Sequence, residues 1–262
     1  MRTHHFLWLP DGTSLSPLTQ QALEVVDNAA LNMPYVAWPE KSEKLLLNNG
    51  LSARKERELQ KLEGLQSLYN VWLSQELQEA GFEAECPVRD ARYASDGQRV
   101  DFARLVEDDK RMMVEVEFGY TASIERNFFK FADAYHHGRS VFGVMLLPLL
   151  SLARTIANGI ATYETAVERL KSFHPKTLPV PVLVIGLDHV DTPRLDLSES
   201  QLPDAACLSG NRGKTVLWHV ASELRAGVCV QDIRLPSASE ERAAQARQKC
   251  RLRHADGQSQ LF

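Results

Sequence analysis

The sequence has few of the features that mark secreted, fibrous or zinc-binding proteins. Its four cysteines, at positions 86, 207, 229 and 250, lie far apart and form no C-x-x-C pair. We therefore expect reduced thiols, a cytoplasmic location and no zinc site. Glycine and proline number only 14 and 12 in 262 residues, which is too few for a fibrous or disordered chain. No segment recurs at a fixed period, so a repeat architecture is not expected.

Long hydrophobic runs and a positive overall charge are also absent. The most apolar stretch, VFGVMLLPLLSLA at residues 141–153, is too short to cross a bilayer and is interrupted by Pro148. The first residues, MRTHHFLWLPDG, lack the apolar core of a signal peptide, and we expect no membrane association. The formal net charge is −4. A surface that binds nucleic acid would therefore have to be a basic patch on one part of the molecule.

What the chain does have is a globular composition and alternating helix and strand patterns. Hydrophobic residues make up 44% and charged residues 24% of the sequence. Between residues 54 and 187 the patterns predict helix, strand, hairpin, helix, strand, helix and strand. The two strand-helix-strand units at the end of this order favour parallel crossovers. We predict an α/β fold, with a mixed β-sheet flanked by helices on both faces and a smaller C-terminal appendage.

The same patterns divide the chain into three regions. Residues 1–53 form an N-terminal helical and loop region, 54–190 the core, and 191–262 an appendage with a basic tail. The predicted helices are 17–32, 52–80, 121–138, 160–173 and the tail 241–254; the predicted strands are 82–88, 99–106, 111–118, 141–148 and 179–188. Residues 33–44 are expected to form a loop and 191–204 a linker. Residues 213–224 and 226–235 are either two short strands or a strand and a helix.

Acidic residues stand out in the predicted hairpin. The segment RMMVEVEFGY, residues 111–120, carries Glu115 and Glu117 two residues apart in an otherwise apolar strand. Their side chains therefore point to the same side. In the preceding strand, Asp101 lies between Val100 and Phe102. If the apolar residues of both strands face the core, the three acidic residues share the other face.

The hairpin register decides how closely these acidic residues meet. A three-residue loop at 107–109 places Asp101 opposite Glu115, and a five-residue loop at 107–111 places it opposite Glu117. A loop of four residues would send Asp101 to the wrong face unless a β-bulge intervened. Both odd lengths bring the three carboxylates within cross-strand reach.

Three carboxylates this close raise one another's pKa unless a cation compensates them. Because the candidate ligands are all oxygens, the pattern favours Mg²⁺, with Mn²⁺ also plausible. Such an ion can activate water and bind a phosphate, which is the chemistry of phosphodiester hydrolysis. The alternative is that these are ordinary surface acids on a solvated sheet face. The apolar opposite face and the basic residues of the following helix favour the site.

The ordered segments VDF and MMVEVEFGY, followed by an amphipathic helix, resemble the D-(x)n-E-x-(K/E/Q) pattern of the PD-(D/E)XK nucleases. More narrowly, the chain is similar to type II restriction endonucleases of the BglII, BstYI and BamHI group. In that group glutamine or glutamate replaces the lysine of the pattern, and Glu117 stands at this position. The segments LYNVWLSQELQEAGFEAECPV and IATYETAVERLKSFHPKTLPVPVLVIGL extend the resemblance to residues 65–190.

The resemblance implies roles for individual residues. Asp101 and Glu115 would bind the metal, together with the backbone carbonyl of Val116. Glu117 would position or deprotonate the attacking water. Glu85 matches a fourth polar group of the site, and an ordinary solvated acid on the strand is an equal alternative for it.

The resemblance also implies that the chain binds double-stranded DNA. Arg126 and Lys130 would contact phosphates, while Tyr120 or Asn127 would reach base edges. Further phosphate-binding candidates are Arg89, Arg92 and the basic tail from Arg242 to Arg253. The alternative for each basic residue is an ordinary solvated helix face or turn. A palindromic target would require a homodimer, for which the helices 123–137 and 160–173 are candidate surfaces.

Three functions are compatible with these patterns. The first is a Mg²⁺-dependent restriction endonuclease that acts as a homodimer on a short palindromic site. The second is a nuclease of the same fold that acts in repair or phage defence without a fixed site. The third is a non-catalytic protein that binds DNA or another partner. The joint presence of Asp101, Glu115 and Glu117 weakens the third.

Overall fold

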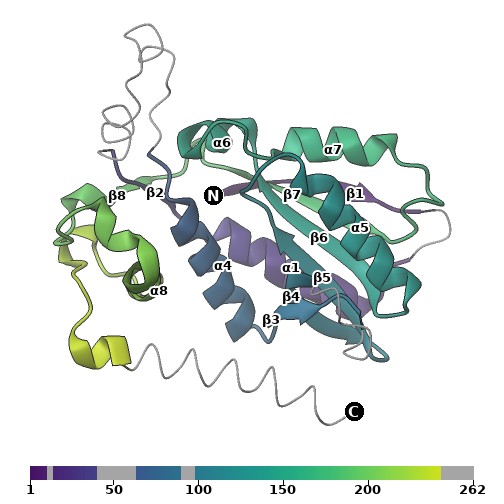
Figure 1. Ribbon diagram of the computed structural model, residues 1–262, viewed down its shortest axis with the longest axis horizontal. Helices are drawn as coiled ribbons and strands as arrows, with labels where there is room; N and C mark the ends of the chain where they lie inside the picture. The colour runs from purple at the N-terminus through teal and green to yellow at the C-terminus, as the bar shows by residue number, and fades with distance from the viewer. Residues whose placement is uncertain (11–13, 40–62, 90–97, 243–262) are drawn as a thin grey trace, which may run out of the picture. The chain divides into compact units, whose positions relative to one another are not determined.

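The computed structural model describes residues 1–10, 14–39, 63–89 and 98–242, and they fall into two compact units (Figure 1). The first unit contains residues 1–32, 76–153 and 158–190; the second contains 33–75, 154–157 and the residues from 191 onward. Helices α4 (Gln66–Glu79) and α6 (Leu150–Ile156) each include a boundary between the units. The predicted division at residues 53 and 190 follows the sequence rather than these units, and it stays a prediction.

A six-stranded mixed sheet forms the centre of the first unit, in the order β1-β7-β6-β5-β4-β3. Its strands are β1 (Arg2–Trp8), β3 (Glu83–Pro87), β4 (Arg99–Glu107), β5 (Lys110–Val116), β6 (Ser140–Pro148) and β7 (Val182–Asp188). The pairs β5–β6 and β6–β7 are parallel, and β1–β7, β4–β5 and β3–β4 are antiparallel. The two expected strand-helix-strand crossovers are therefore confirmed.

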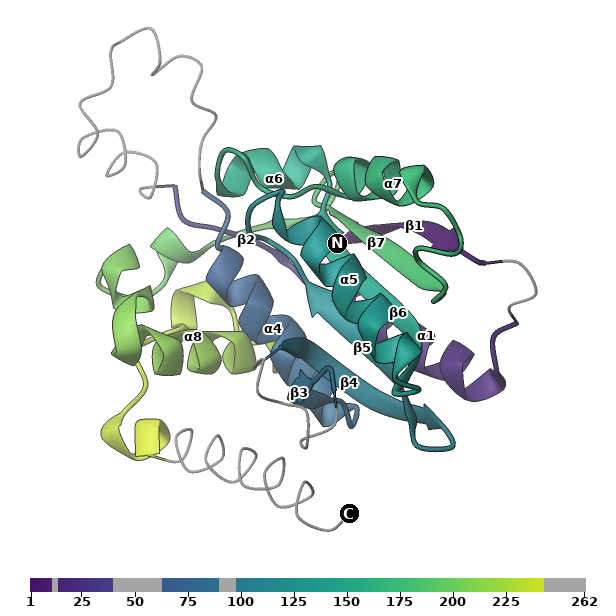
Figure 2. The same cartoon turned by 45° about the vertical axis from the view of Figure 1, so that its right-hand side comes forward.

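Helices cover both faces of this sheet. On one face α5 (Ser123–His136) lies against β6, and α7 (Tyr163–Ser172) lies against β6 and β7. On the other face α1 (Pro17–Leu31) contacts β1 and β4. Figures 1 and 2 show α5 crossing in front of the strands and α1 behind them. The predicted fold class, a mixed sheet flanked by helices on both faces, is confirmed.

Two glycines allow the helices to approach the sheet closely. A Cβ atom on Gly143 of β6 would lie 2.6 Å from the Phe131 ring of α5. A Cβ atom on Gly186 of β7 would lie 2.7 Å from the Tyr163 ring at the start of α7. Both distances are shorter than carbon atoms tolerate, so only glycine permits this packing. The buried rings of Phe128 and Phe131 then fix α5 on the sheet.

The hairpin between β4 and β5 has one of the predicted registers, but its turn differs from the predicted loops. The pairs Phe102–Val114 and Ala103–Met113 correspond to the register of the three-residue loop. Near the turn, however, the register shifts between Leu105 and Glu107, and Glu107 pairs with Lys110. A two-residue turn thus combines with a β-bulge, which has the same effect on the strand register as a longer loop. Asp109 takes the positive φ of 64° that this turn requires.

Several segments differ from the sequence-based expectation. Residues 2–8 form the edge strand β1, which the sequence patterns did not identify. The expected loop at 33–44 contains β2 (Tyr35–Ala37), and the expected linker at 191–204 contains β8 (Arg194–Asp196). These two strands pair in parallel, although they lie far apart in the sequence. The predicted helix 52–80 begins as α4 at Gln66 in the described part, and its residues 52–62 lie outside the description.

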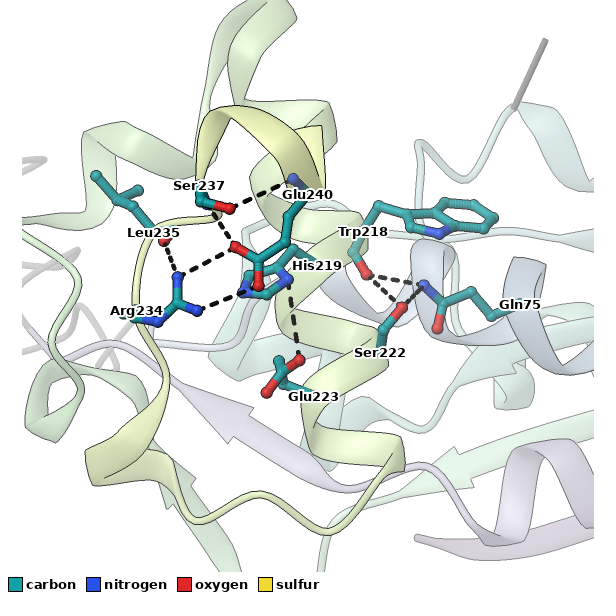
Figure 3. A network of polar contacts seen from close by, with 9 residues as sticks. All are labelled: Gln75, Trp218, His219, Ser222, Glu223, Arg234, Leu235, Ser237 and Glu240. Carbon is teal, nitrogen blue, oxygen red and sulfur yellow. Dashed lines mark hydrogen bonds and ion pairs between the residues drawn. The ribbon is translucent and has the colours of Figure 1, made fainter. Parts of the chain in front are cut away.

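The second unit contains the two-stranded β2–β8 sheet, the 16-residue helix α8 and several one-turn helices. Its helical elements after β8 are η2 (Leu197–Glu199), η3 (Ala205–Leu208), α8 (Gly210–Arg225) and η4 (Val230–Asp232). In Figure 3 the Gln75 amide donates to the Trp218 carbonyl (2.8 Å) and the Ser222 hydroxyl (2.9 Å), which links α4 to α8. Further along, Glu240 accepts the Ser237 N–H at 2.6 Å, while the Ser237 hydroxyl accepts the Glu240 N–H. This reciprocal pair is a capping box that starts a helical turn.

No helix in the described ranges has the length and apolarity that crossing a membrane requires. The predicted basic tail lies almost entirely outside the described residues, which end at Arg242.

Candidate functional site

The three acidic residues singled out by the sequence meet where β4 and β5 lie beneath α5. Asp101 belongs to β4, Glu115 to β5, and Glu117 follows the end of β5 directly. Only 4% of Glu115 and 8% of Glu117 is exposed. The solvated sheet face of the alternative interpretation is therefore not what the structure has. These acids lie on a covered face, where each needs a polar partner.

The Asp101 carboxylate takes over the role of a backbone acceptor between the two strands. The regular β4–β5 pairing ends at Phe102–Val114, and continuing its register places Asp101 beside Glu115. The Val116 N–H donates to Asp101 Oδ2 at 2.7 Å. A side-chain oxygen of β4 thus holds the end of β5, which fixes Asp101 at the position where Glu115 and Glu117 project.

Glu115 has a cationic partner that comes from α5. Lys130 Nζ donates to Glu115 Oε1 at 2.5 Å. The lysine side chain is 12% exposed and the glutamate side chain 5%. The ion pair is therefore largely shielded from solvent, in contrast to a solvated surface pair.

Glu117 is held at both carboxylate oxygens. The Gly119 N–H donates to Oε1 at 2.7 Å, and Asn127 Nδ2 donates to Oε2 at 2.9 Å. Asn127 lies on α5 and is completely buried. A Cβ atom at position 119 would lie 2.6 Å from Glu117 Oε1, so the glycine lets the backbone approach the carboxylate. With one donor at each oxygen, the carboxylate is held in one orientation.

The electrostatics of the group follow from burial and from like charges. Burial, followed by the Asp101 charge, raises the pKa of Glu115 to about 8, although Lys130 acts in the opposite direction. Burial likewise raises the pKa of Asp101, opposed by the Val116 N–H and by Lys130. Glu85 and Glu117 raise the pKa of Asp101 further through their charges. The acids are thus coupled, and their ionised forms require more positive charge than Lys130 alone provides.

Glu85 lies near this group but on a more open part of β3. Its residue is exposed and has a positive φ of 54°, an unusual conformation for glutamate. Its backbone carbonyl accepts a hydrogen bond from Arg99 at 2.5 Å. In the β3–β4 register Ala84 pairs with Phe102 and Cys86 with Val100, so Glu85 lies opposite Asp101. This placement is compatible with the predicted fourth polar group, and its role stays a prediction.

The four predicted DNA-contacting residues separate into two pairs. Tyr120 is 79% exposed, and Arg126 also lies on the surface, so both are available to a ligand. Asn127 and Lys130 instead point inward to Glu117 and Glu115. The prediction that Asn127 reads base edges does not fit its complete burial, because its donor is committed to Glu117. Lys130 likewise contacts the acidic group rather than the outer surface.

Arg126 lines a pocket on the outer side of α5. The pocket has a volume of about 660 Å³, and its lining residues are Arg89, Gln98, Arg126, Phe129, Ala132, Asp133, His136 and Thr177. Arg89 donates to both carboxylate oxygens of Asp133, at 2.8 and 2.9 Å. This contact places Arg89, a predicted phosphate ligand, in a bidentate ion pair. Arg92 lies outside the described residues.

The donor set suits a hard divalent cation. Glu115 offers a buried carboxylate and Asp101 a partly buried one, with no sulfur or imidazole among the described atoms that contact them. In the described part of the chain, no three His, Cys, Asp and Glu side chains are already gathered as a metal-binding group. Each acid instead accepts a hydrogen bond from the protein, Asp101 from the Val116 N–H, Glu115 from Lys130 and Glu117 from Asn127. A cation would have to compete with Lys130 for Glu115.

Sequence reasoning missed the inward roles of Asn127 and Lys130. The signal for Asn127 was available, because it falls within the apolar stripe of Ile124, Phe128 and Phe131 on α5. A polar residue in such a stripe requires a buried partner. Lys130 lies three residues further along, on the same side of the helix as Asn127.

Comparisons with known proteins agree with this fold. A family model described as restriction endonuclease BglII/BglIII matches residues 42–187, which is more than half of the chain. A crystal structure of restriction endonuclease BglII in complex with a DNA 16-mer is similar, with 18% identity and a TM-score of 0.52. The match covers 71% of this chain and 76% of that one. Free BglII matches with 17% identity and a TM-score of 0.46, covering 72% and 80%. No curated protein matches in sequence.

Proposed function

Because this chain belongs to the family of restriction endonucleases BglII/BglIII, we propose that it is a Mg²⁺-dependent type II restriction enzyme. Membership of the family supports a site-specific DNA endonuclease. The dependence on Mg²⁺, the short palindromic target, the homodimer and the cytoplasmic location are our proposal. The E-x-E arrangement, with glutamate at position 117, is part of the same proposal.

One observation carries this proposal. Asp101 from β4 and Glu115 from β5 lie together beneath α5, burial raises the pKa of both carboxyl groups, and the Asp101 charge raises the pKa of Glu115 further. Maintaining such a cluster is costly for a protein that gains nothing from it, because buried like charges oppose folding. Perturbed, coupled acids of this kind are typical of functional sites.

Asp101, Glu115 and the backbone carbonyl of Val116 are the proposed metal ligands. A bound Mg²⁺ would supply positive charge that polarises the phosphate and lowers the pKa of a coordinated water. The chain's own residues set the geometry. The Val116 N–H holds Asp101, and α5 holds Glu115 through Lys130.

Glu117 is the proposed group that positions the attacking water. Its two oxygens are fixed by Gly119 and Asn127, and each can accept a further hydrogen bond. In the hydrolysis, the water oxygen forms a bond to phosphorus while one phosphorus–oxygen bond to a sugar breaks. The water loses a proton, and the departing sugar oxygen gains one. The products are a phosphate monoester and a free hydroxyl group.

Tyr120 and Arg126 are the proposed DNA contacts near the site, because both are exposed at the start of α5. A palindromic target presents two equivalent half-sites, which a two-fold homodimer matches. We propose that α5 and α7 contribute to its interface. Phe129 of α5 is 56% exposed, and its ring lies edge-on to Phe173, which follows α7. These rings form an apolar surface that both helices share.

The test is a digest of phage DNA with the purified protein in Mg²⁺, with a parallel reaction in excess EDTA. We expect discrete fragments in Mg²⁺ and intact DNA in EDTA. A smear in place of fragments would show a nuclease without a fixed site. The absence of cleavage under both conditions would leave a DNA-binding protein and would overturn the proposal.

A further inference from the structure

The acidic residues of the site are accompanied by one cation among the described residues that contact them. Position 117, where the common PD-(D/E)XK pattern has a lysine, carries glutamate. The strands alone therefore bring Asp101, Glu115 and Glu117 together and provide no positive charge. Lys130 of α5 is the cation that acts on both Asp101 and Glu115.

Lys130 is spaced from Asn127 on α5 so that the two side chains reach the two glutamates at the end of β5. Asn127 and Lys130 are three residues apart on α5, which corresponds to about 4.5 Å along the helix axis. Their partners Glu117 and Glu115 are two residues apart on extended chain, which corresponds to about 6.6 Å. A long lysine side chain covers the difference. One face of α5 thus provides a partner for each glutamate in turn.

The helix that carries Lys130 is firmly seated. Phe128 and Phe131 are completely buried, and Phe131 packs directly over Gly143 of β6. Because these residues flank Lys130 on α5, the ammonium group is held at the site by the core of the unit. A surface lysine would lose more side-chain entropy to keep a contact of 2.5 Å.

We propose that Lys130 is the lysine of this active site, delivered from α5 instead of from strand position 117. Its ammonium group holds Glu115 before the metal arrives and then supplies fixed positive charge beside the scissile phosphate. Of its three N–H donors, one is used on Glu115, and the others can reach a phosphate oxygen or water. This role rests on the proposed function, and it assigns to the chain the positive charge that Glu117 cannot provide.

The proposal predicts that loss of the Lys130 charge has opposite effects on metal binding and on cleavage. A fixed positive charge next to the metal ligands repels a divalent cation, so removing it should strengthen metal binding. The same charge stabilises the negative charge that develops on the phosphate, so removing it should slow cleavage. If the role of Lys130 were purely structural, its removal would weaken metal binding and slow cleavage together.

The experiment compares wild-type protein with Lys130→Gln, Lys130→Arg and the control Lys176→Gln, an exposed lysine on the loop after α7. Mn²⁺ binding is measured by calorimetry, and kcat and KM are measured on a DNA that the wild type cuts. For Lys130→Gln we expect the Kd for Mn²⁺ to fall about fivefold and kcat to fall about 100-fold. KM should stay within about threefold, since the interaction acts in the transition state. Lys130→Arg keeps the charge and should stay near the wild-type Kd with partly restored kcat, and Lys176→Gln should match the wild type.

The result that would overturn the proposal is a Lys130→Gln variant with unchanged kcat, or one whose Mn²⁺ affinity falls together with its melting temperature. Failure of the proposed function looks different, because the wild type itself would then cut no DNA. The Mn²⁺ titration still distinguishes the two cases, since it measures whether Lys130 and a cation compete without any cleavage.

Discussion

At the scale of single residues, Asp101 tests the site most directly. Asp101→Asn keeps the shape of the side chain and an oxygen for the Val116 N–H, but it removes a charged metal ligand. We expect cleavage to fall by at least about 1,000-fold, since a charged group that acts at the reacting centre is lost. Binding of the target DNA in Ca²⁺ should be retained or strengthened because one negative charge near the phosphate is gone.

The matched variant is Glu115→Gln, which should behave in the same way. Fragment analysis on a gel and a mobility-shift assay in Ca²⁺ measure cleavage and binding separately. Normal cleavage by either variant would show that these acids are not the metal ligands.

The raised pKa of Glu115 predicts how the metal-free protein responds to pH. Its pKa rises from an ordinary 4.5 to about 8 in the folded protein. Between these values the folded chain holds a proton that the unfolded chain releases, so stability decreases as the pH rises. The slope attributable to this one group is at most about 1.4 kcal/mol per pH unit. In EDTA, the melting temperature of the wild type should therefore fall from pH 5 to pH 8 more steeply than that of Glu115→Gln.

Both melting curves are recorded by circular dichroism in the same buffers, so that other titrating groups cancel in the difference. Parallel curves for the two proteins would contradict the predicted coupling. Adding Mg²⁺ should reduce the difference, because a cation favours the ionised carboxylate.

At the scale of secondary-structure elements, the contact between α5 and β6 is the place most sensitive to a change in side-chain volume. Gly143→Ala would place a methyl group 2.6 Å from the Phe131 ring. We expect a loss of about 1–3 kcal/mol in unfolding free energy, together with a loss of activity, because α5 also carries Asn127 and Lys130. Urea unfolding of the purified variant measures the first effect.

A double variant with Phe131→Leu provides the control. The smaller side chain leaves room for the methyl group, so the combined destabilisation should be less than the sum of the single effects. Simple additivity would show that the two residues do not determine how closely the helix approaches the sheet.

Elements with strong local patterns could be predicted from the sequence, and those that depend on distant partners could not. The strands β6 and β7 are continuous apolar runs, and α5 and α7 have apolar residues at helical spacing. By contrast, β2 and β8 have three residues each, and they exist because Tyr35–Ala37 meets Arg194–Asp196. The edge strand β1 is half exposed, so its sequence RTHHFLW shows no clear alternation.

The residues of the site also fall into those that a local pattern predicts and those that depend on tertiary packing. A period of two along β5 was enough to place Glu115 and Glu117 on one side and to pair them with Asp101. The inward direction of Lys130 depends on how α5 is rotated about its axis on the sheet. That rotation is set by Phe131 over Gly143, a contact that single-sequence patterns do not reveal.

At the scale of the whole molecule, the proposed homodimer predicts a defined change in mass. Phe129→Glu places a charge on the apolar surface shared by α5 and Phe173, and we expect the dimer dissociation constant to rise by at least about tenfold. The comparison variant is Leu105→Glu, which changes another exposed apolar residue, 55% accessible, on β4. Light scattering after size-exclusion chromatography measures the mass of each protein. Equal masses for the Phe129 variant and the wild type would place the interface elsewhere.

The pairing of β1 with β7 has a consequence for biosynthesis. Residues 2–8 leave the ribosome long before their partner, residues 182–188, which follows only after the hairpin, α5 and α7 have emerged. A nascent chain can therefore assemble its carboxylates before its sheet has both edges. Because β1 and α1 close the sheet from the opposite end of the sequence, completion of the fold is delayed until translation has passed β7.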